Sequence, residues 1–574
     1  MKWLFSGVLC LLSLSGAAEE ARRPNVLVVI TDDQGWGDLS SHGNADIRTP
    51  VMDGLAAAGA RFEHFYVSPV CSPTRASLLT GRYHWRTGVS GVTRGMETMR
   101  AEEVTMAEVF GPAGYATGAF GKWHSGAHYP NHPNGQGFAE FTGFCRGHWN
   151  NYFSTTLEHD GVDFQSEGYI NDYLTDKALA FMQGHAGAPF LCYLAYNTPH
   201  SPLQVPDPYF DAAKARGLDD EHAAVYAMCE NLDHNLGRLL GWLDEAKLAE
   251  DTIVVFLGDN GPNTDRFNGG MRGRKGSVHE GGMRNLLFLR YPRRIPAGTV
   301  VPQLAAHIDI LPTLADLAGV KLPDPERLDG ISLVPYIEGK ADGADDRTIY
   351  ELWGGKRTLR TAQYRWVRES RDPQLYDMHA DPGETQDLAE AQPELVEKFT
   401  QAYDDFVLPA VDIWTKPPPI PVGYEAAPLV RLDGPEATLN GGLKTFGKHA
   451  NNSWITDWSN TEDTIAWELE VVKAGDYAVT LQYTCAENNL GARIEASVPG
   501  DATTATLTEA HDPGYLPSPD RVPRSEVYER TWASLDLGTL TLPKGDVALT
   551  LRATEIPGAI AADVKEVFLK PVSH

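Results

Sequence analysis

The stretch "NVLVVITDDQ", residues 25–34, decides the fold of this 574-residue chain. Its apolar residues are continuous rather than alternating, which is typical of a strand buried on both faces of a sheet. Two later runs have the same form, "FLCYLAYNTPH" at 190–200 and "TIVVFLGDNG" at 252–261, and a helical pattern covers 221–248. Buried strands separated by helices predict an α/β domain whose functional residues lie at the carboxyl ends of the strands.

The sequence pattern changes twice beyond this domain. "TLRTAQYRWVRE" predicts a hairpin and 393–406 a helix, so we expect a small α+β subdomain there. After a Pro-rich stretch, Ile465, Trp467 and Leu469 alternate with polar residues, and later segments do the same, which predicts an antiparallel β-sandwich. The predicted organisation is a signal peptide at 1–18, an α/β domain at 23–345, a C-terminal subdomain at 346–414, a linker at 415–428 and an all-β sandwich at 429–574.

Composition and the N-terminal segment restrict the class of protein. The net charge of −28 argues against nucleic acid as a partner, because phosphate binding needs a basic face. Lys2, an apolar stretch and small residues at 15–18 predict a secretory signal peptide, so we expect bacterial export, with the protein secreted or periplasmic. No later stretch is long and apolar enough to predict a transmembrane segment.

Polar oxygen ligands directly follow two of the apolar runs. Asp32 and Asp33 end the first run, and Asp259 and Asn260 follow the third. Carboxylate and amide oxygens suit Ca²⁺ or Mg²⁺ better than Zn²⁺. Either pair alone is better explained by a turn or a helix cap, but two pairs at the ends of neighbouring strands favour a metal site.

Basic side chains occur in short polar sets beside these runs. They are Lys122 and His124 in "GKWH", His200 in "NTPH" and Lys275 in "RKGS". Lys122 and His124 are two residues apart, so in an extended segment both face the same side. A single residue of this kind is usually a solvated or simply hydrogen-bonded side chain. Combined with two carboxylate pairs, the set predicts a metal-assisted site for an oxyanion ester.

Cys71 stands apart from the other cysteines, which are widely spaced and predict no disulfide framework. It lies in "PVCSPTRASLLTGR", residues 69–82, at the mouth of a helix that we expect to begin near Pro73. Arg75 follows one helical turn later, so both side chains project from one face. A thiol nucleophile is one interpretation of such a cysteine, although nothing else in the sequence resembles a cysteine hydrolase.

The segment "CSPTRASLLTGR" resembles the type I sulfatase signature, Cys-x-Pro-x-Arg followed by Leu-Thr-Gly-Arg. The resemblance covers residues 23–408 in the family's order, through "PNVLVVITDDQGWGDLSSHGN", "GKWHSG", "NTPHSPL", "GDNG", "RKGSVHEGG", "HIDILPTLADLAG", "LDGISLVP" and "LYDMHADPGETQDLA". The chain is thereby identified as similar to the formylglycine-dependent sulfatases of the alkaline phosphatase superfamily. This resemblance implies a central mixed sheet flanked by helices, followed by a small C-terminal α+β subdomain.

The resemblance also implies a cofactor made from the chain itself. Cys71 would be oxidised to formylglycine by a formylglycine-generating or anaerobic sulfatase-maturating enzyme. Its hydrate would carry two hydroxyls, one to attack sulfur and one to expel sulfate, which a serine could not do. Asp32, Asp33, Asp259 and Asn260, with the modified side chain at 71, would bind Ca²⁺, or Mg²⁺ in its place.

The same resemblance implies roles for the basic residues. Arg75 would hold the diol and the metal ligands in place. Lys122, His200 and Lys275 would bind sulfate oxygens. His124 would be the base that restores the aldehyde, and His200 or Lys275 would protonate the leaving oxygen.

The substrate is less directly indicated. His148 and Asn150 in "GFCRGHWNNYF" are candidates for further substrate contacts. The sandwich resembles carbohydrate-binding modules in pattern only, and Trp454 and Trp458 within it fit either exposed sugar-stacking or buried core positions. With export and an acidic surface, these features favour a sulfatase acting on a sulfated oligo- or polysaccharide such as a fucan or galactan.

Two other functions remain open at this point. A phosphonate or phosphate-diester hydrolase of the same superfamily can carry a similar formylglycine motif. A glycan-binding protein with an inactive sulfatase domain would keep the fold without turnover. Zinc-type alkaline phosphatases are disfavoured, because they need a Ser or Thr nucleophile and a richer set of Asp and His ligands.

Overall fold

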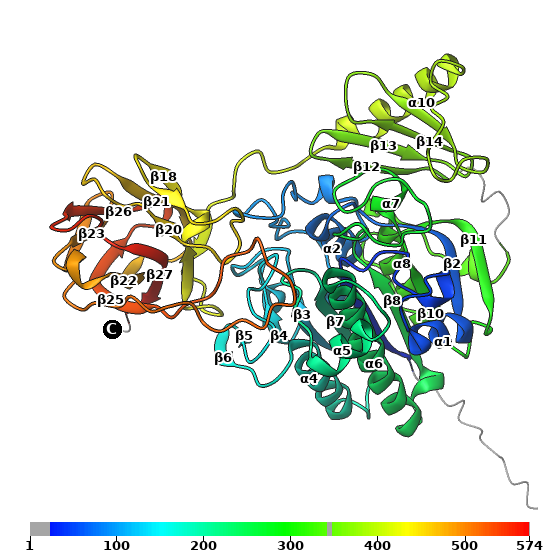
Figure 1. Cartoon of the computed structure of the whole chain (residues 1–574), viewed down its shortest axis with the longest axis horizontal. Coiled ribbons are helices and arrows are strands. Elements are labelled where there is room, and N and C mark those ends of the chain that lie inside the picture. Colours follow the sequence, from blue (N-terminus) through cyan, green and yellow to red (C-terminus); the bar gives the residue numbers. More distant parts are fainter. Residues whose placement is uncertain (1–22, 341–346, 573–574) are drawn as a thin grey trace, which may run out of the picture.

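The computed structural model describes residues 23–340 and 347–572. The signal peptide predicted for 1–18 and the domain boundary predicted at 345/346 lie outside the described residues. Figure 1 shows a large α/β unit, a small sheet with one long helix above it, and a separate β-rich unit to one side. No helix in the described ranges is long and apolar enough to cross a membrane.

The α/β unit is built on an eleven-stranded sheet in which strand β1 is central. The strand order is β11-β2-β10-β8-β1-β7-β3-β4-β5-β6, and β9 pairs with β2. β1 runs parallel to both β7 and β8, whereas β10 is antiparallel to β8, so the sheet is mixed as expected. The strands are β1 Asn25–Asp32, β2 Ala60–Tyr66, β3 Ala116–Lys122, β4 Glu140–Phe144, β5 Thr156–His159, β6 Val162–Gln165, β7 Phe190–Pro199, β8 Thr252–Gly258, β9 Arg284–Asn285, β10 Leu287–Arg290 and β11 Thr299–Ala306.

Helices cover both faces of this sheet, which explains the continuous apolar runs. Alternate side chains of a strand point to opposite faces. Leu27 and Val29 of β1 join a core with helices α1, α4 and α6, whereas Val28 joins another with α2 and α8. The helices are α1 Pro50–Ala58, α2 Cys71–Thr80, α3 Met106–Phe110, α4 Ile170–Gly184, α5 Asp207–Lys214, α6 Asp220–Glu245, α7 Glu280–Met283, α8 Ile310–Ala318 and α9 Val334–Ile337.

The small subdomain is a four-stranded antiparallel sheet with one helix. β13 and β14 form the predicted hairpin, and the helix spans the predicted residues. Trp366 and Tyr403 are fully buried and share a core with Tyr66 and Trp85 of the α/β unit, so the two parts are packed together. The elements are β12 Ile349–Trp353, β13 Lys356–Arg360, β14 Tyr364–Arg368, β15 Gln374–Asp377 and α10 Pro393–Phe406.

The C-terminal unit consists of two six-stranded sheets around one core. One has the order β16-β21-β26-β23-β24 with β18 on β21, and the other β19-β20-β27-β22-β25 with β17 on β27. The strands are β16 Ile420–Val422, β17 Val430–Asp433, β18 Thr438–Asn440, β19 Lys444–Thr445, β20 Ile455–Thr456, β21 Thr464–Val471, β22 Gly475–Thr484, β23 Arg493–Val498, β24 Asp501–Thr506, β25 Ala533–Leu542, β26 Gly545–Glu555 and β27 Asp563–Pro571. The consecutive strands β21 and β22 belong to opposite sheets.

The linker predicted for 415–428 is wrong over residues 420–422. Ile420 and Val422 are buried in the sandwich core, and their strand β16 pairs in parallel with β21 at the edge of the sheet. Pro421 between them is compatible with an edge position, because an edge strand need not donate every backbone hydrogen bond. Because this stretch is rich in Pro, its sequence pattern predicts a linker, although Ile420 and Val422 are both core residues.

The sandwich also sends a long connection back to the α/β unit. Figure 1 shows the orange segment between β24 and β25 crossing from the sandwich to the region beside β7. Within it, the backbone N–H of Arg521 donates to the carbonyl of Leu203 at 3.0 Å, and its guanidinium donates to the carbonyl of Val205 at 2.7 Å. The two units therefore contact each other through ordered side chains as well as through the covalent connection.

Candidate active site

The predicted site residues come from four adjacent parallel strands. These strands lie side by side in the order β8-β1-β7-β3 and end at the same edge of the sheet. The last residue of each strand, or a residue just after it, is polar. These residues are Asp259 and Asn260 after β8, Asp32 and Asp33 at the end of β1, His200 after β7 and Lys122 at the end of β3. The sheet brings together residues that are up to 228 positions apart, because parallel strands present their carboxyl ends at one edge.

Cys71 is the first residue of helix α2, two residues earlier than the predicted start. Every residue of this helix is buried, and Cys71 itself is 4% exposed. Burial raises the pKa of the Cys71 thiol, although Lys122 and Lys275 act in the opposite direction. A protonated buried thiol is a poor nucleophile, so the unmodified cysteine does not fit the role of a thiolate catalyst.

Oxygen atoms without hydrogen-bond partners converge near Cys71. Ligand atoms of Asp32, Cys71 and Asp259 all lie within 4.8 Å of one another. Within the described ranges, Asp32 Oδ1, Asp33 Oδ2 and Asn260 Oδ1 are buried and accept no hydrogen bond. Because an unpaired buried oxygen is costly, these atoms fit a hard divalent cation bound to carboxylate and amide ligands. These side chains could therefore hold a hard divalent cation, and their assignment as calcium or magnesium ligands stays a prediction.

Two basic side chains, Lys122 and Arg75, hold Asp32 and Asp259 in position. Lys122 Nζ lies 2.6 Å from Asp32 Oδ2, and both side chains are fully buried. Arg75 donates to Asp259 Oδ2 from Nη2 at 2.9 Å and from Nε at 3.2 Å. Its Nη1 also donates to the carbonyl of Lys122 at 2.9 Å.

Asp33 is paired in the same way at the more open side of the site. Lys275 Nζ lies 2.5 Å from Asp33 Oδ1, and His200 Nε2 lies 3.8 Å from Oδ2. Their side chains are 22% and 14% exposed, whereas the Lys122 and Arg75 side chains are fully buried. The site is therefore open to solvent beside Lys275 and His200.

The ionisation of the carboxylates follows from this arrangement. Burial acts to raise the pKa of Asp33, but the charges of Lys275 and His200 hold it well below its usual range. Burial and the charge of Asp32 raise the pKa of Asp259 to about 6, in spite of Arg75. Burial and Lys275 lower the pKa of His200 to about 4. A bound cation would relieve the repulsion between Asp32 and Asp259.

His124 reaches the site by a different route from the one predicted. Strand β3 ends at Lys122, and His124 has a positive φ of 57°, so the two residues do not lie on one extended segment. The Nε2–H of His124 donates to the carbonyl of Val92 at 2.9 Å, which leaves Nδ1 as the buried acceptor without a partner in the described ranges. Burial and Lys122 lower the pKa of His124 well below its usual range. The imidazole is therefore a neutral group with one free lone pair.

His148 and Asn150 lie beside the exposed part of the site. The His148 ring stacks on His200 with centroids 5.9 Å apart and an interplanar angle of 13°. Its Nε2 donates to Asn150 Oδ1 at 3.1 Å. The structure thus places both substrate candidates next to a predicted sulfate ligand.

Two neighbours of these residues were missed by the sequence analysis, and both come from the sandwich. Asn452 Nδ2 donates to the carbonyl of His148 at 2.8 Å, and Arg524 donates to the carbonyl of Asn150. Ser201, next to His200, donates to the carboxylate of Glu526. No local pattern marks these contacts, because they join segments more than 300 residues apart.

Trp454 and Trp458, left open between two roles, are core residues. They are 2% and 0% exposed, and Trp454 stacks on Phe446 with centroids 4.3 Å apart. Neither presents a ring face for a sugar.

Comparison with known proteins shows that the chain is similar to sulfatases over the part that contains this site. The sulfatase family model matches residues 24–320, and the model of the C-terminal region of N-sulphoglucosamine sulphohydrolase matches residues 274–404. Human arylsulfatase A is 31% identical over 68% of this chain and 89% of its own length. An N-acetylgalactosamine-6-O-sulfatase from Bacteroides thetaiotaomicron is 27% identical over 67% of this chain and 93% of its own length.

A solved structure is similar to this chain over about the same share of its length. The crystal structure of Ps i-CgsB in complex with a neocarrahexaose has a TM-score of 0.63 and 28% identity, and the match covers 67% of this chain and 93% of that chain. Both family models end before the first strand of the sandwich. The sandwich is therefore outside the part of the chain that defines the family.

Proposed function

Because the chain belongs to the sulfatase family and is a sulfuric ester hydrolase, we propose that it releases inorganic sulfate from a sulfated carbohydrate. The observation that carries this proposal is the buried cluster of Cys71, three carboxylates and three basic residues at one edge of the sheet. Such a cluster is suited to an ester that carries negative charge, because the basic groups are fixed before the substrate arrives.

Asp32, Asp33, Asp259 and Asn260 would hold a divalent cation, Ca²⁺ by preference and Mg²⁺ as the alternative. Such a cation supplies positive charge that offsets a sulfate oxygen and lowers the pKa of a hydroxyl next to it. Arg75 keeps Asp259 in place through its two hydrogen bonds, so it acts as a positioning residue for this set.

A formylglycine made from Cys71 would supply two hydroxyl groups on one carbon, whereas a serine supplies one. The position at the start of α2 supports this proposal, since the free N–H groups of a helix N-terminus favour an anion there. Lys122 and Lys275 would bind sulfate oxygens beside Cys71, because both charges lie close enough to lower the pKa of its thiol.

His124 and His200 would handle protons. His124 Nδ1 is the free acceptor of a neutral ring whose other nitrogen is fixed by Val92, so it would take a proton from the nucleophilic residue. His200 Nδ1 donates to the carbonyl of Ser201 at 2.7 Å, which turns Nε2 toward Asp33 and the open side of the site. Lys275, or His200 when its Nε2 also carries a proton, would protonate the leaving oxygen there.

The choice of a sulfated carbohydrate rests on the relatives and on the open side of the site. The Bacteroides relative is named for a sulfated amino sugar, and the neighbouring crystal structure contains a carrageenan-type hexasaccharide. His148 stacks on His200 and is hydrogen-bonded to Asn150, so these two residues would lie next to a sugar ring whose sulfate is bound beside His200. We therefore include a sulfated polysaccharide or its oligosaccharides in the proposal.

The test is sulfate release from a panel of defined sulfated oligosaccharides, with a phosphate diester at equal concentration and intact-mass analysis of residue 71. We expect sulfate release by material that carries the aldehyde, and no release by Cys71→Ser. Turnover of the diester alone would favour the phosphate-diester hydrolase. Tight glycan binding without any sulfate release by aldehyde-containing protein would favour the inactive, glycan-binding alternative.

A further inference from the structure

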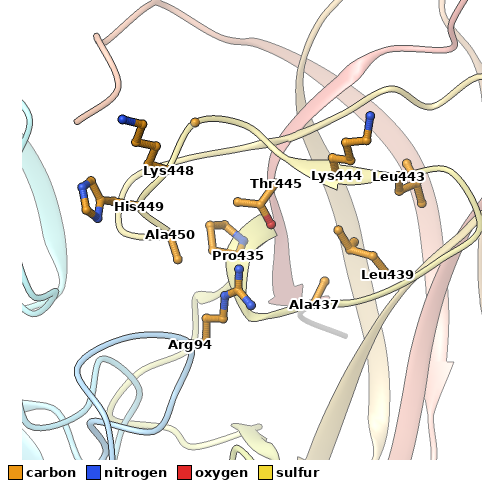
Figure 2. Close-up of a pocket in the computed structure, with 11 residues that line it drawn as sticks. Arg94, Pro435, Ala437, Leu439, Leu443, Lys444, Thr445, Lys448, His449 and Ala450 are labelled. Carbon is orange, nitrogen blue, oxygen red and sulfur yellow. The ribbon is translucent and has the colours of Figure 1, made fainter. Parts of the chain in front are cut away.

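A pocket of about 420 Å³ lies where the α/β unit meets the sandwich. Arg94 forms one side, and the segment Leu443–Ala450 of the sandwich forms the other. Figure 2 shows Arg94 rising from the blue loop of the α/β unit toward Pro435 and Thr445 of the sandwich. Neither unit alone forms this pocket.

The pocket is basic in a chain whose net charge is −28. Arg94, Lys444, Lys448 and His449 line it, and none of the described residues that line it is acidic. Lys444 pairs with Asp457 at 3.0 Å. Within residues 23–340 and 347–572, the side chains of Arg94 and Lys448 have no hydrogen-bond or ion-pair partner. Figure 2 shows the Lys448 ammonium directed away from Arg94, but because neither cation is paired, both side chains can turn toward an anion.

Apart from Thr445, the remaining side chains of the lining are apolar. Pro435, Ala437, Leu439 and Leu443 supply hydrocarbon surface on the sandwich side. A site with a few polar groups on an apolar base is typical of small-molecule recognition, and the volume falls within the usual range of about 300–1,000 Å³. An anionic sugar is complementary to both parts of the pocket. The C–H groups of its ring can contact the apolar residues, and its charged substituent can contact the basic residues.

Both sides of the pocket are connected to the candidate active site. Val92, two residues before Arg94, accepts the hydrogen bond that fixes His124. Two residues of extended chain span at most about 7 Å. On the other side, Asn452 donates to the carbonyl of His148 and lies three residues after His449. The pocket is therefore adjacent to the residues that border the sulfate site.

We propose that this junction pocket binds a second anionic group, a sulfate or a carboxylate, on a neighbouring sugar of the same glycan chain. The inference rests on the proposed function, because the site around Cys71 would bind the first sulfate of the same glycan chain. Arg94 and Lys448 contact the anion, and the apolar residues contact the ring. The sandwich accordingly forms part of the substrate site instead of binding glycan at a distance from it.

The test uses the full chain with Arg94→Asn and Lys448→Ala combined. Asn is chosen at position 94 because this residue has a φ of 61°, a left-handed conformation that Asn tolerates. The matched control is Lys321→Ala with Lys544→Ala, which removes the same charge from exposed positions after α8 and between β25 and β26. Each protein is assayed with p-nitrophenyl sulfate, which carries one sulfate and no sugar.

A sulfated carrageenan hexasaccharide and its desulfated form are then titrated into each protein, by calorimetry and as competitors of p-nitrophenyl sulfate. We expect the pocket variant to bind the sulfated hexasaccharide about tenfold or more weakly, as for loss of charge-assisted contacts. Its kcat/KM for p-nitrophenyl sulfate stays within about twofold of the wild type, because one sulfate does not reach the pocket. The control variant binds as the wild type does.

Unchanged affinity of the pocket variant for the sulfated hexasaccharide would overturn the proposal, and so would equal binding of the desulfated form. Calorimetry needs no turnover, so the pocket is tested even by a protein that hydrolyses nothing. Failure of the wild type to hydrolyse any sulfate ester would instead overturn the proposed function.

Discussion

Replacing Arg75 by Met removes one partner of a buried ion pair and keeps most of the aliphatic stem. Arg75 and Asp259 are both fully buried, and the guanidinium donates twice to one carboxylate oxygen, at 2.9 and 3.2 Å. Leaving one charge of a buried pair without its partner costs about 3–5 kcal/mol. We expect Arg75→Met to destabilise the region around α2 by this amount at pH 8 when a chelator removes free divalent cations.

The loss depends on pH in a direction set by Asp259. Burial and Asp32 raise the pKa of this carboxyl from 3.8 to about 6. A raised pKa in the folded state means that stability is fully present below pH 3.8 and is lost as the pH rises through about 6. Removing Arg75 raises this pKa further, and each unit adds about 1.4 kcal/mol to the loss at high pH. The deficit is therefore larger at pH 8 than at pH 5, where Asp259 can be protonated.

Hydrogen exchange of peptides that cover Cys71–Thr80 and β8 measures this effect locally. A global unfolding curve is less suitable, because a chain of several units need not unfold in two states. The matched control is Arg75→Met combined with Asp259→Asn, which removes both charges and should recover most of the opening free energy. A deficit below about 1 kcal/mol, an equal deficit at pH 5 and pH 8, or no recovery in the double variant would refute the reasoning.

Three further changes test separate parts of the site. Lys122→Met removes a charge-assisted contact and should lower kcat/KM for an aryl sulfate by about 10- to 150-fold; a smaller loss would contradict a role in sulfate binding. Asp32→Asn should weaken Ca²⁺ binding at least about tenfold by calorimetry, and unchanged affinity would contradict the metal assignment. Asn452→Gly removes the hydrogen bond to the His148 carbonyl and tolerates the φ of 55° at this position, so it should raise KM for sulfated oligosaccharides with little change in thermal stability. Asn440→Gly, elsewhere in the sandwich, is its control, and equal effects of the two would contradict a positioning role.

Much of the α/β unit could be predicted from the sequence because its signals are local. The apolar runs at β1, β7 and β8 are continuous because helices cover both faces of the sheet, and this pattern needs no knowledge of the partners. The polar residues at their carboxyl ends were found for the same reason, since parallel strands end at one edge. The residues that form the cluster around Cys71 were therefore predictable individually.

The pairing within that cluster was not predictable. The sequence does not say that Arg75 binds Asp259 while Lys122 binds Asp32, because both choices satisfy the same charges. His124 was assigned to an extended segment, but the strand ends at Lys122 and a left-handed residue turns the ring toward Val92. The φ angle of His124 determines where its ring lies, and the amino-acid sequence around His124 does not indicate that angle.

By itself, the sequence determined the strands, the helix beside Cys71 to within two residues of its start, and the residue types at the edge of the sheet, since each depends on neighbours close along the chain. Only the tertiary structure decided that Asn452 and Arg524 support His148 and Asn150, that β16 belongs to the sandwich, and that Arg94 and Lys448 line one pocket. These contacts depend on how separately folded units are oriented. The orientation of the units depends on the shape and charge of the surfaces that they form after folding. Residues close together along the chain do not determine these surfaces.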